Sequence, residues 1–152
     1  MLINLKATFY FFLNGYLLTK NERITESEHY FLKSINANIS FWNGYDLLFK
    51  QYEKQSRLKD FKVLLDKAKT IFTNNIKLFY YESLYLFRKK EYKQSLSILT
   101  HKHLEKKFTQ NQNEKDIADY YHLLSRLYEK LGRFNESYNF AIKRNKTILA
   151  FE

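Results

Sequence analysis

The sequence predicts an all-α protein, built from helices that short turns connect. Apolar residues recur at intervals of three and four along nearly the whole chain, as at Tyr45, Leu48 and Tyr52, which is the periodicity of helices with one buried face. The chain has no proline and three glycines, so few residues favour breaks between elements. No segment shows the sustained alternation of apolar and polar residues that is typical of strands.

Short polar segments separate the expected helices at regular distances. The apolar residue that follows the break inside each expected helix pair is Ile24, Leu58, Tyr92 and Phe134. Successive members of this set are 34, 34 and 42 residues apart. A period of about 34 residues predicts stacked pairs of antiparallel helices. The alternative is an unrelated helical bundle in which this spacing is a coincidence.

The first helix of each pair carries large residues at equivalent positions. One position is aromatic in every pair and is expected to be buried: Phe11, Tyr45, Phe79 and Tyr121. Another, four residues before the turn, holds Leu18, Tyr52, Leu86 and Tyr128. Gly132 lies at the last turn, where a residue without Cβ adopts a positive φ at the least cost. The turns within the pairs are therefore expected near residues 22, 56, 90 and 132.

The second helix of each pair matches the pattern in part. A small-residue position holds Ser27, Phe61, Ser95 and Ser137, and a later one holds Ser34, Ala68, Lys102 and Arg144. Thr25 and Glu28 have the spacing of a capping box at the start of the first of these helices. The eight additional residues before the last pair are expected to lengthen a helix and add a loop, with Asn113 as the cap of the next helix.

These positions together resemble the tetratricopeptide repeat (TPR) family over residues 8–150. The resemblance implies a TPR-like right-handed superhelix, a solenoid of about four antiparallel helix pairs that forms a single domain over residues 1–152. The expected repeats are about 8–41, 42–75, 76–109 with a following insertion, and 118–150.

The end of the chain has a narrower resemblance. It looks like the last repeat of the TPR region that lies N-terminal to a class of bacterial sulfotransferases. The matching residues are Leu131, Gly132, Phe134, Glu136, Ser137, Tyr138 and Asn145. The nucleotide-binding Gly-rich loop and the catalytic region of those enzymes have no counterpart in this sequence.

The net charge of +10 would suit a polyanionic partner, but the cations are not clustered. Lysines alternate with acidic residues in most segments, and the longest basic runs are 88–90 and 106–107. A basic, solvated surface is therefore favoured over a dedicated nucleic-acid interface. A sequence without cysteine contains no disulfide and no thiolate chemistry.

The apolar start of the chain is too short and too interrupted to span a bilayer, because Asn4, Lys6, Asn14 and Gly15 fall within it. No small-residue cleavage site follows, as a secretory signal would require. A cytoplasmic protein without a membrane partner is the expectation.

No arrangement of residues predicts catalysis. The three glycines are dispersed and form no phosphate-binding loop. His101 and His103 are the single metal-like pair, and no cysteine or close carboxylate pair completes a site. We therefore expect no catalytic, cofactor-binding or metal-binding residues.

The TPR resemblance implies a non-catalytic interaction module that binds a peptide or protein, with an acidic segment as one option, along the first helices of its pairs. The candidate groove residues are Phe12, Tyr16, Lys50, Lys77, Tyr80, Leu84, His122 and Arg126, with Phe9, Asn43, Asp46 and Asp119 beside them. Two alternatives remain open: a sulfotransferase's TPR region without its catalytic domain, and a basic helical-repeat protein that binds nucleic acid.

Overall fold

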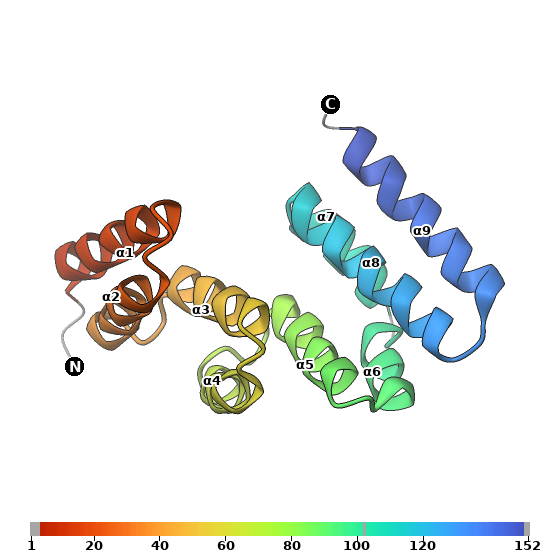
Figure 1. The fold of residues 1–152 in the computed structure, drawn as a ribbon, viewed down its shortest axis with the longest axis horizontal. Helices are drawn as coiled ribbons and strands as arrows, with labels where there is room; N and C mark the ends of the chain where they lie inside the picture. The colour runs from red at the N-terminus through yellow and green to blue at the C-terminus, as the bar shows by residue number, and fades with distance from the viewer. Residues whose placement is uncertain (1–3, 102, 151–152) are drawn as a thin grey trace. The chain divides into compact units, whose positions relative to one another are not determined.

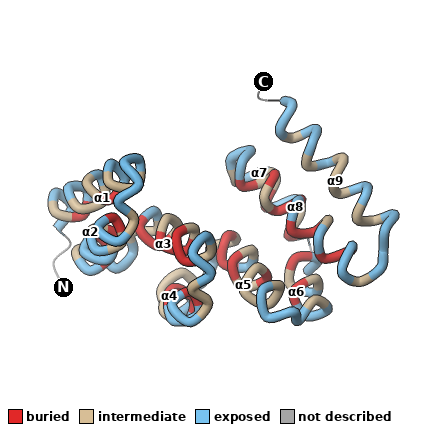
Figure 2. The backbone as a smooth tube through the Cα atoms, viewed as in Figure 1, coloured by how far each residue is buried: buried red, intermediate tan, exposed pale blue. Residues whose placement is uncertain are grey.

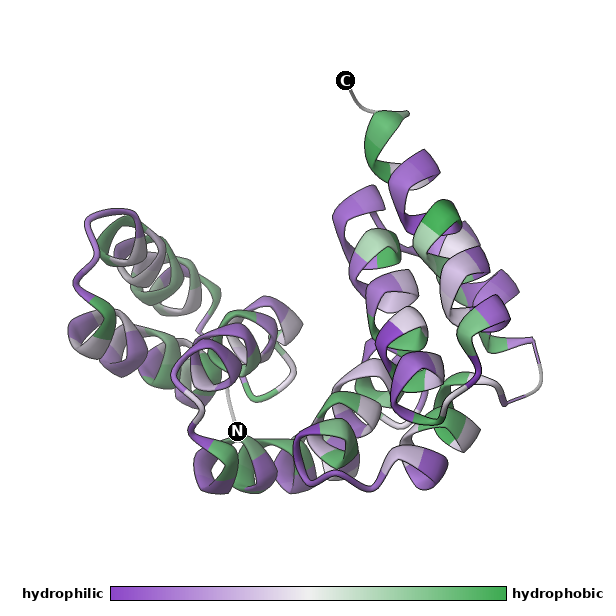
Figure 3. Ribbon diagram, turned by 45° about the vertical axis from the view of Figure 1, so that its right-hand side comes forward, coloured by the Kyte–Doolittle hydropathy of each residue, from purple (hydrophilic) through white to green (hydrophobic). Residues whose placement is uncertain are grey.

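The computed structural model describes residues 4–101 and 103–150, which form nine α-helices and no strand (Figure 1). The helices are α1 (Leu5–Lys20), α2 (Ile24–Ala37), α3 (Trp42–Lys54), α4 (Leu58–Ile71), α5 (Ile76–Arg88), α6 (Tyr92–Leu99), α7 (Leu104–Asn111), α8 (Glu114–Lys130) and α9 (Phe134–Leu149). Hydrophobic and hydrophilic segments both occur along the helices (Figure 3), as expected for helices with one buried face. The all-α prediction is confirmed.

The chain divides into two compact units, residues 1–73 and 74–152. Unit 1 contains the hairpins α1–α2 and α3–α4, with α2 packed against α3. Unit 2 contains the hairpins α5–α6 and α8–α9, with α6 packed against α8 and the short α7 beside α5 and α8. The boundary between the units lies close to the predicted boundary between the second and third repeats.

Each hairpin turn has the same backbone geometry. One residue per turn has a positive φ: Glu22 (60°), Ser56 (57°), Lys90 (64°) and Gly132 (74°). The next amide donates back across the turn, from Arg23 to the Leu18 carbonyl (2.9 Å), Arg57 to Tyr52 (2.8 Å), Glu91 to Leu86 (2.9 Å) and Arg133 to Tyr128 (2.8 Å). This is the Schellman pattern of helix ends. The turns therefore fall at the expected residues, and the spacing 34, 34 and 42 is a property of the backbone.

Lys90→Gly is expected to raise the free energy of unfolding by about 0.5–1 kcal/mol, because glycine adopts the positive φ of this turn without strain. Glycine also gives the unfolded chain more conformational entropy, but this effect offsets only part of the gain. The measurement is urea denaturation followed by circular dichroism. Lys93→Gly is the matched control, since Lys93 lies exposed inside α6, where glycine costs about 1 kcal/mol. Equal effects from both variants would contradict the role of the turn.

Hydroxyl contacts join the two helices in three hairpins, each through the serine at the same position of its second helix. The Ser95 hydroxyl donates to the Ser83 carbonyl (2.7 Å), and the Ser83 hydroxyl donates to the Ser95 carbonyl (2.9 Å). In α8–α9 the Ser125 hydroxyl donates to the Ser137 carbonyl (2.9 Å). In α1–α2 the hydroxyl of Ser27 lies 2.6 Å from that of Thr19. The predicted small-residue position thus lies where the two helices of a pair approach each other.

The predicted aromatic core positions are correct in part. Tyr45 and Tyr121 are buried, and Phe11 is half-buried against Tyr30. Phe79 is 40% exposed, so the prediction that it is buried is wrong. The residues of α5 that its own unit buries are Lys77, Leu78, Tyr81 and Ser83. Phe79 follows Leu78 by one residue, and a helix turns by about 100° per residue, which carries the ring off that face.

The sequence predicts that the insertion lengthens a helix, and this prediction is wrong. The insertion forms a separate helix, α7. The α6 helix ends at Leu99, and His103 has a positive φ of 61° immediately before α7 begins. The Phe108 ring of α7 stacks on Tyr120 of α8 at 4.7 Å between centroids. Asn113 caps α8 as expected, because its side chain accepts from the amide of Asp116.

The predicted capping box at Thr25 is wrong. The cap residue of α2 is Arg23, and no side chain caps the helix there. The Glu28 carboxylate instead accepts from the Arg57 guanidinium (2.5 Å and 3.1 Å) and from the Tyr52 hydroxyl (3.1 Å). Glu28 therefore joins the two hairpins of unit 1, because a guanidinium offers a stronger charge-assisted hydrogen bond than a backbone amide.

Candidate partner-binding surface

A polar stripe runs along the outer side of α8. The opposite side of the helix is buried through the apolar residues Ala118, Tyr120, Tyr121, Leu123, Leu124, Leu127 and Tyr128 (Figure 2). Residues three or four apart lie on one side of a helix, so Lys115, Asp119, His122 and Arg126 form the outer stripe. Two of the predicted groove residues, His122 and Arg126, lie in it.

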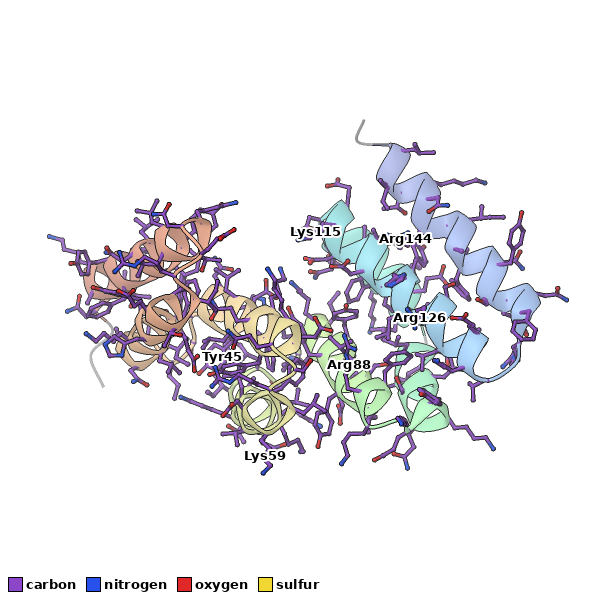
Figure 4. All side chains as sticks on the ribbon, in the orientation of Figure 1. Tyr45, Lys59, Arg88, Lys115, Arg126 and Arg144 are labelled. Carbon is purple, nitrogen blue, oxygen red and sulfur yellow. The ribbon has the colours of Figure 1, made fainter. Side chains whose placement is uncertain are left out.

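The α9 helix adds a further cation next to this stripe. Figure 4 places Arg126 on α8 and Arg144 on the neighbouring α9. Arg144 has no ion-pair partner among the residues that the structure describes. Arg126 pairs with Glu129 at 3.2 Å, but both side chains are about half exposed, and such pairs contribute little. We call Lys115, His122, Arg126 and Arg144 the α8–α9 basic surface.

The lowered pKa of His122 indicates that Arg126 and Arg144 both act on this ring. Its pKa lies below the ordinary value of 6.5, first because partial burial disfavours the charged ring. The positive charges of Arg144 and Arg126 lower the pKa further, and Asp119 alone opposes them. The position therefore has an excess of positive potential, which an anion would relieve.

The lowered pKa of His122 predicts a loss of stability in acid. The unfolded chain binds this proton more readily than the folded one, so the contribution is fully present above a pH of about 6.5 and is lost as the pH falls through the folded pKa. We expect His122→Asn to flatten the fall in unfolding free energy between about pH 7 and pH 5. Denaturation at several pH values tests this. His29→Asn, at an exposed residue of α2, is the control, and equal flattening by both variants would refute the assignment.

Three predicted groove residues of unit 2 face its interior. The Lys77 side chain is 7% exposed, and its ammonium lies 3.1 Å from the Asp116 carboxylate. Tyr80 and Leu84 are half-buried and pack against the apolar core that α7 and α8 share. The structure therefore does not bring these residues together with His122 and Arg126 on one outer surface.

The predicted groove residues of unit 1 each contact a different neighbour. Phe12 packs edge-on against Phe41 at 5.1 Å between ring centroids, so it contributes to the packing of unit 1. Tyr16 is exposed, and the Lys20 ammonium lies over its ring. Lys50 pairs with Asp46 at 3.0 Å.

The histidine pair lies beside a hollow of unit 2. His101 and His103 line a space of about 590 Å³ together with Tyr120, Tyr128 and Phe140. Among the described residues, no group of three or more His, Asp or Glu side chains is arranged to hold a metal ion.

Sequence reasoning missed two members of the α8–α9 basic surface. Arg144 occupies a position where the repeat pattern has a small residue, and that departure was the available signal for this cation. Lys115 lies four residues before Asp119, and this helical spacing would have placed it on the same stripe.

Comparisons with known proteins leave the family open. A scan against known protein families and a search of curated proteins find no match to this chain. Any assignment of function therefore depends on the residues and geometry described above.

Proposed function

We propose that this chain is a non-catalytic interaction module that binds an acidic segment of a partner protein at the α8–α9 basic surface. One observation carries the proposal: Arg126 and Arg144, on two different helices, both depress the pKa of His122. Guanidinium groups suit this role because they donate paired hydrogen bonds to carboxylates. Gathered cations also attract an acidic chain more strongly than isolated ones do.

The proposal includes the TPR class and its right-handed superhelix. The support is the repetition of one turn geometry at residues 22, 56, 90 and 132, together with the serine contacts inside the pairs. Modules of stacked helix pairs bind peptides along exposed helix faces. We place this module in the bacterial cytoplasm, since its sequence contains no cysteine and so depends on no oxidising compartment.

Fluorescence anisotropy with two labelled peptides of equal length, one built from Glu and Leu and one from Lys and Leu, tests the function. We expect the chain to bind the acidic peptide and not the basic one. Arg126→Gln/Arg144→Gln should weaken binding at least tenfold, since each lost charge-assisted hydrogen bond is worth about 1.5–3 kcal/mol. Binding should tighten as the pH falls, because a bound anion favours the protonated ring of His122.

A charge-matched control separates recognition from bulk attraction. Lys54→Gln/Lys59→Gln removes the same two charges from exposed positions of unit 1. If this variant loses as much affinity as the α8–α9 variant, the net charge of +10 is responsible and the proposed site is refuted. Tighter binding to a labelled single-stranded RNA than to the acidic peptide, with a steep dependence on salt, would favour the nucleic-acid alternative.

A further inference from the structure

The outer face of α1 is apolar and largely exposed, although the Phe9 ring within it also meets Phe41 edge-on at 5.7 Å between centroids. The exposed residues of this helix are Leu5, Lys6, Phe9, Tyr10, Leu13, Tyr16, Leu17 and Lys20. The six uncharged members are each 43–60% exposed. The opposite side of α1 packs on α2, where Gly15 lies against Phe31. The helix therefore has apolar residues on both sides.

This pattern differs from that of other surface helices in the same unit. The exposed residues of α4 are Lys59, Asp60, Lys62, Val63, Asp66, Lys69 and Thr70, of which only Val63 is apolar. A helix with apolar residues all round is normally covered on every side. A contiguous apolar patch, unlike a single exposed residue such as Val63, marks an interaction site.

The charges of α1 indicate what covers this face. The helix contains two lysines, Lys6 and Lys20, and no acidic residue. They lie about 21 Å apart along the axis, one at each end of the apolar stripe. Two copies packed through this face would bring lysines of the two copies near each other at the ends of the stripe, and α1 has no acid to neutralise them. An anionic surface complements the same arrangement.

The residue types on this face also suit a lipid boundary. Leucine and phenylalanine partition into the acyl region, while tyrosine favours the level of the headgroups. Lysine side chains bury their methylene groups and keep the ammonium among the headgroups. Tyr10, Tyr16 and the two lysines could therefore remain in the polar layer while Phe9 and Leu13 enter the apolar one.

We propose that the outer face of α1 docks unit 1 onto an anionic membrane surface, with the helix lying in the plane of the interface. Among the described residues, no helix is long and apolar enough to cross a bilayer. The polar residues within the apolar start of the chain disfavour a spanning helix, whereas docking in the interface requires one apolar face and nearby cations. This inference is independent of the α8–α9 basic surface, which lies in the other unit.

Cosedimentation with phosphatidylcholine vesicles, with and without phosphatidylserine, tests the proposal. We expect binding to the vesicles that contain phosphatidylserine, weaker binding to the neutral ones, and a decrease with salt. Phe9→Glu/Leu13→Glu should reduce binding more than tenfold, because it places two carboxylates at the apolar boundary. Lys6→Gln/Lys20→Gln should reduce binding about fivefold per lysine.

Two matched variants control for the type of substitution. Val63→Glu places a carboxylate at an exposed apolar residue of α4, and Lys54→Gln/Lys59→Gln removes two charges elsewhere in unit 1; both should bind as the wild type does. Circular dichroism checks the fold, and Phe9→Gln/Leu13→Gln replaces the glutamate variant if that variant unfolds. Absence of vesicle binding, or equal loss in the control variants, would overturn the proposal. So would a lipid-free dimer that Phe9→Gln/Leu13→Gln dissociates, which would assign the face to a second copy.

Discussion

Replacing Asp116 with alanine should lower the unfolding free energy of unit 2 by about 3–5 kcal/mol, because it leaves the ammonium of Lys77 buried without its carboxylate. A loss of this size is a large part of the stability of a small folded unit. Urea denaturation followed by circular dichroism measures the change.

The double variant Lys77→Met/Asp116→Leu separates the effect of the two charges from the effect of the volume that the two side chains fill. Two apolar side chains of similar size remove both charges, so this variant should recover most of the stability that Asp116→Ala loses. The fluorescence of Trp42, which packs on Phe72 in unit 1, reports separately on the unit that is not altered. If Asp116→Ala unfolds no more easily than the wild type, the ion pair does not stabilise unit 2.

Phe108→Ala should cost about 3–5 kcal/mol, which is the usual range for a fully buried phenylalanine. The ring is stacked on Tyr120 and lies 6.3 Å from Tyr80, so its removal opens a cavity between α7, α8 and α5. Thermal unfolding followed by circular dichroism measures the loss. Because α7 lies outside the 34-residue pattern, this variant tests whether the insertion is part of the core.

Phe134→Ala is the matched control for that measurement. The same side chain is removed at the start of α9, where it is 68% exposed, so the change should stay within about 0.5 kcal/mol. A similar cost for both variants would show that α7 merely lies on the surface of unit 2.

The sequence predicts the residues of the candidate site only where their proximity follows from spacing along a single helix. His122 and Arg126 lie on the same side of α8 because of their spacing, and the sequence places them there correctly. Lys77 has an equivalent place in the repeat, yet its charge is buried, because α8 brings Asp116 against it. Sequence spacing does not reveal such a partner, which lies far along the chain.

The sequence by itself determined the helical class and the positions of the turns within the pairs. Both depend on local effects: the periodicity of apolar residues defines each helix, and the end of each first helix leads into a turn with a positive φ, including the one at Gly132. Hydrogen bonds across these turns join residues only five apart, as between Arg133 and Tyr128.

Only the tertiary structure decided which faces of these helices are buried and which charges meet. The insertion became α7 because Phe108 finds a stacking partner in Tyr120, which no local signal announces. Arg144 reaches the surroundings of His122 because α9 folds back on α8. Burial and electrostatic interactions depend on neighbours from distant parts of the chain, and a repeat pattern describes those neighbours only on average.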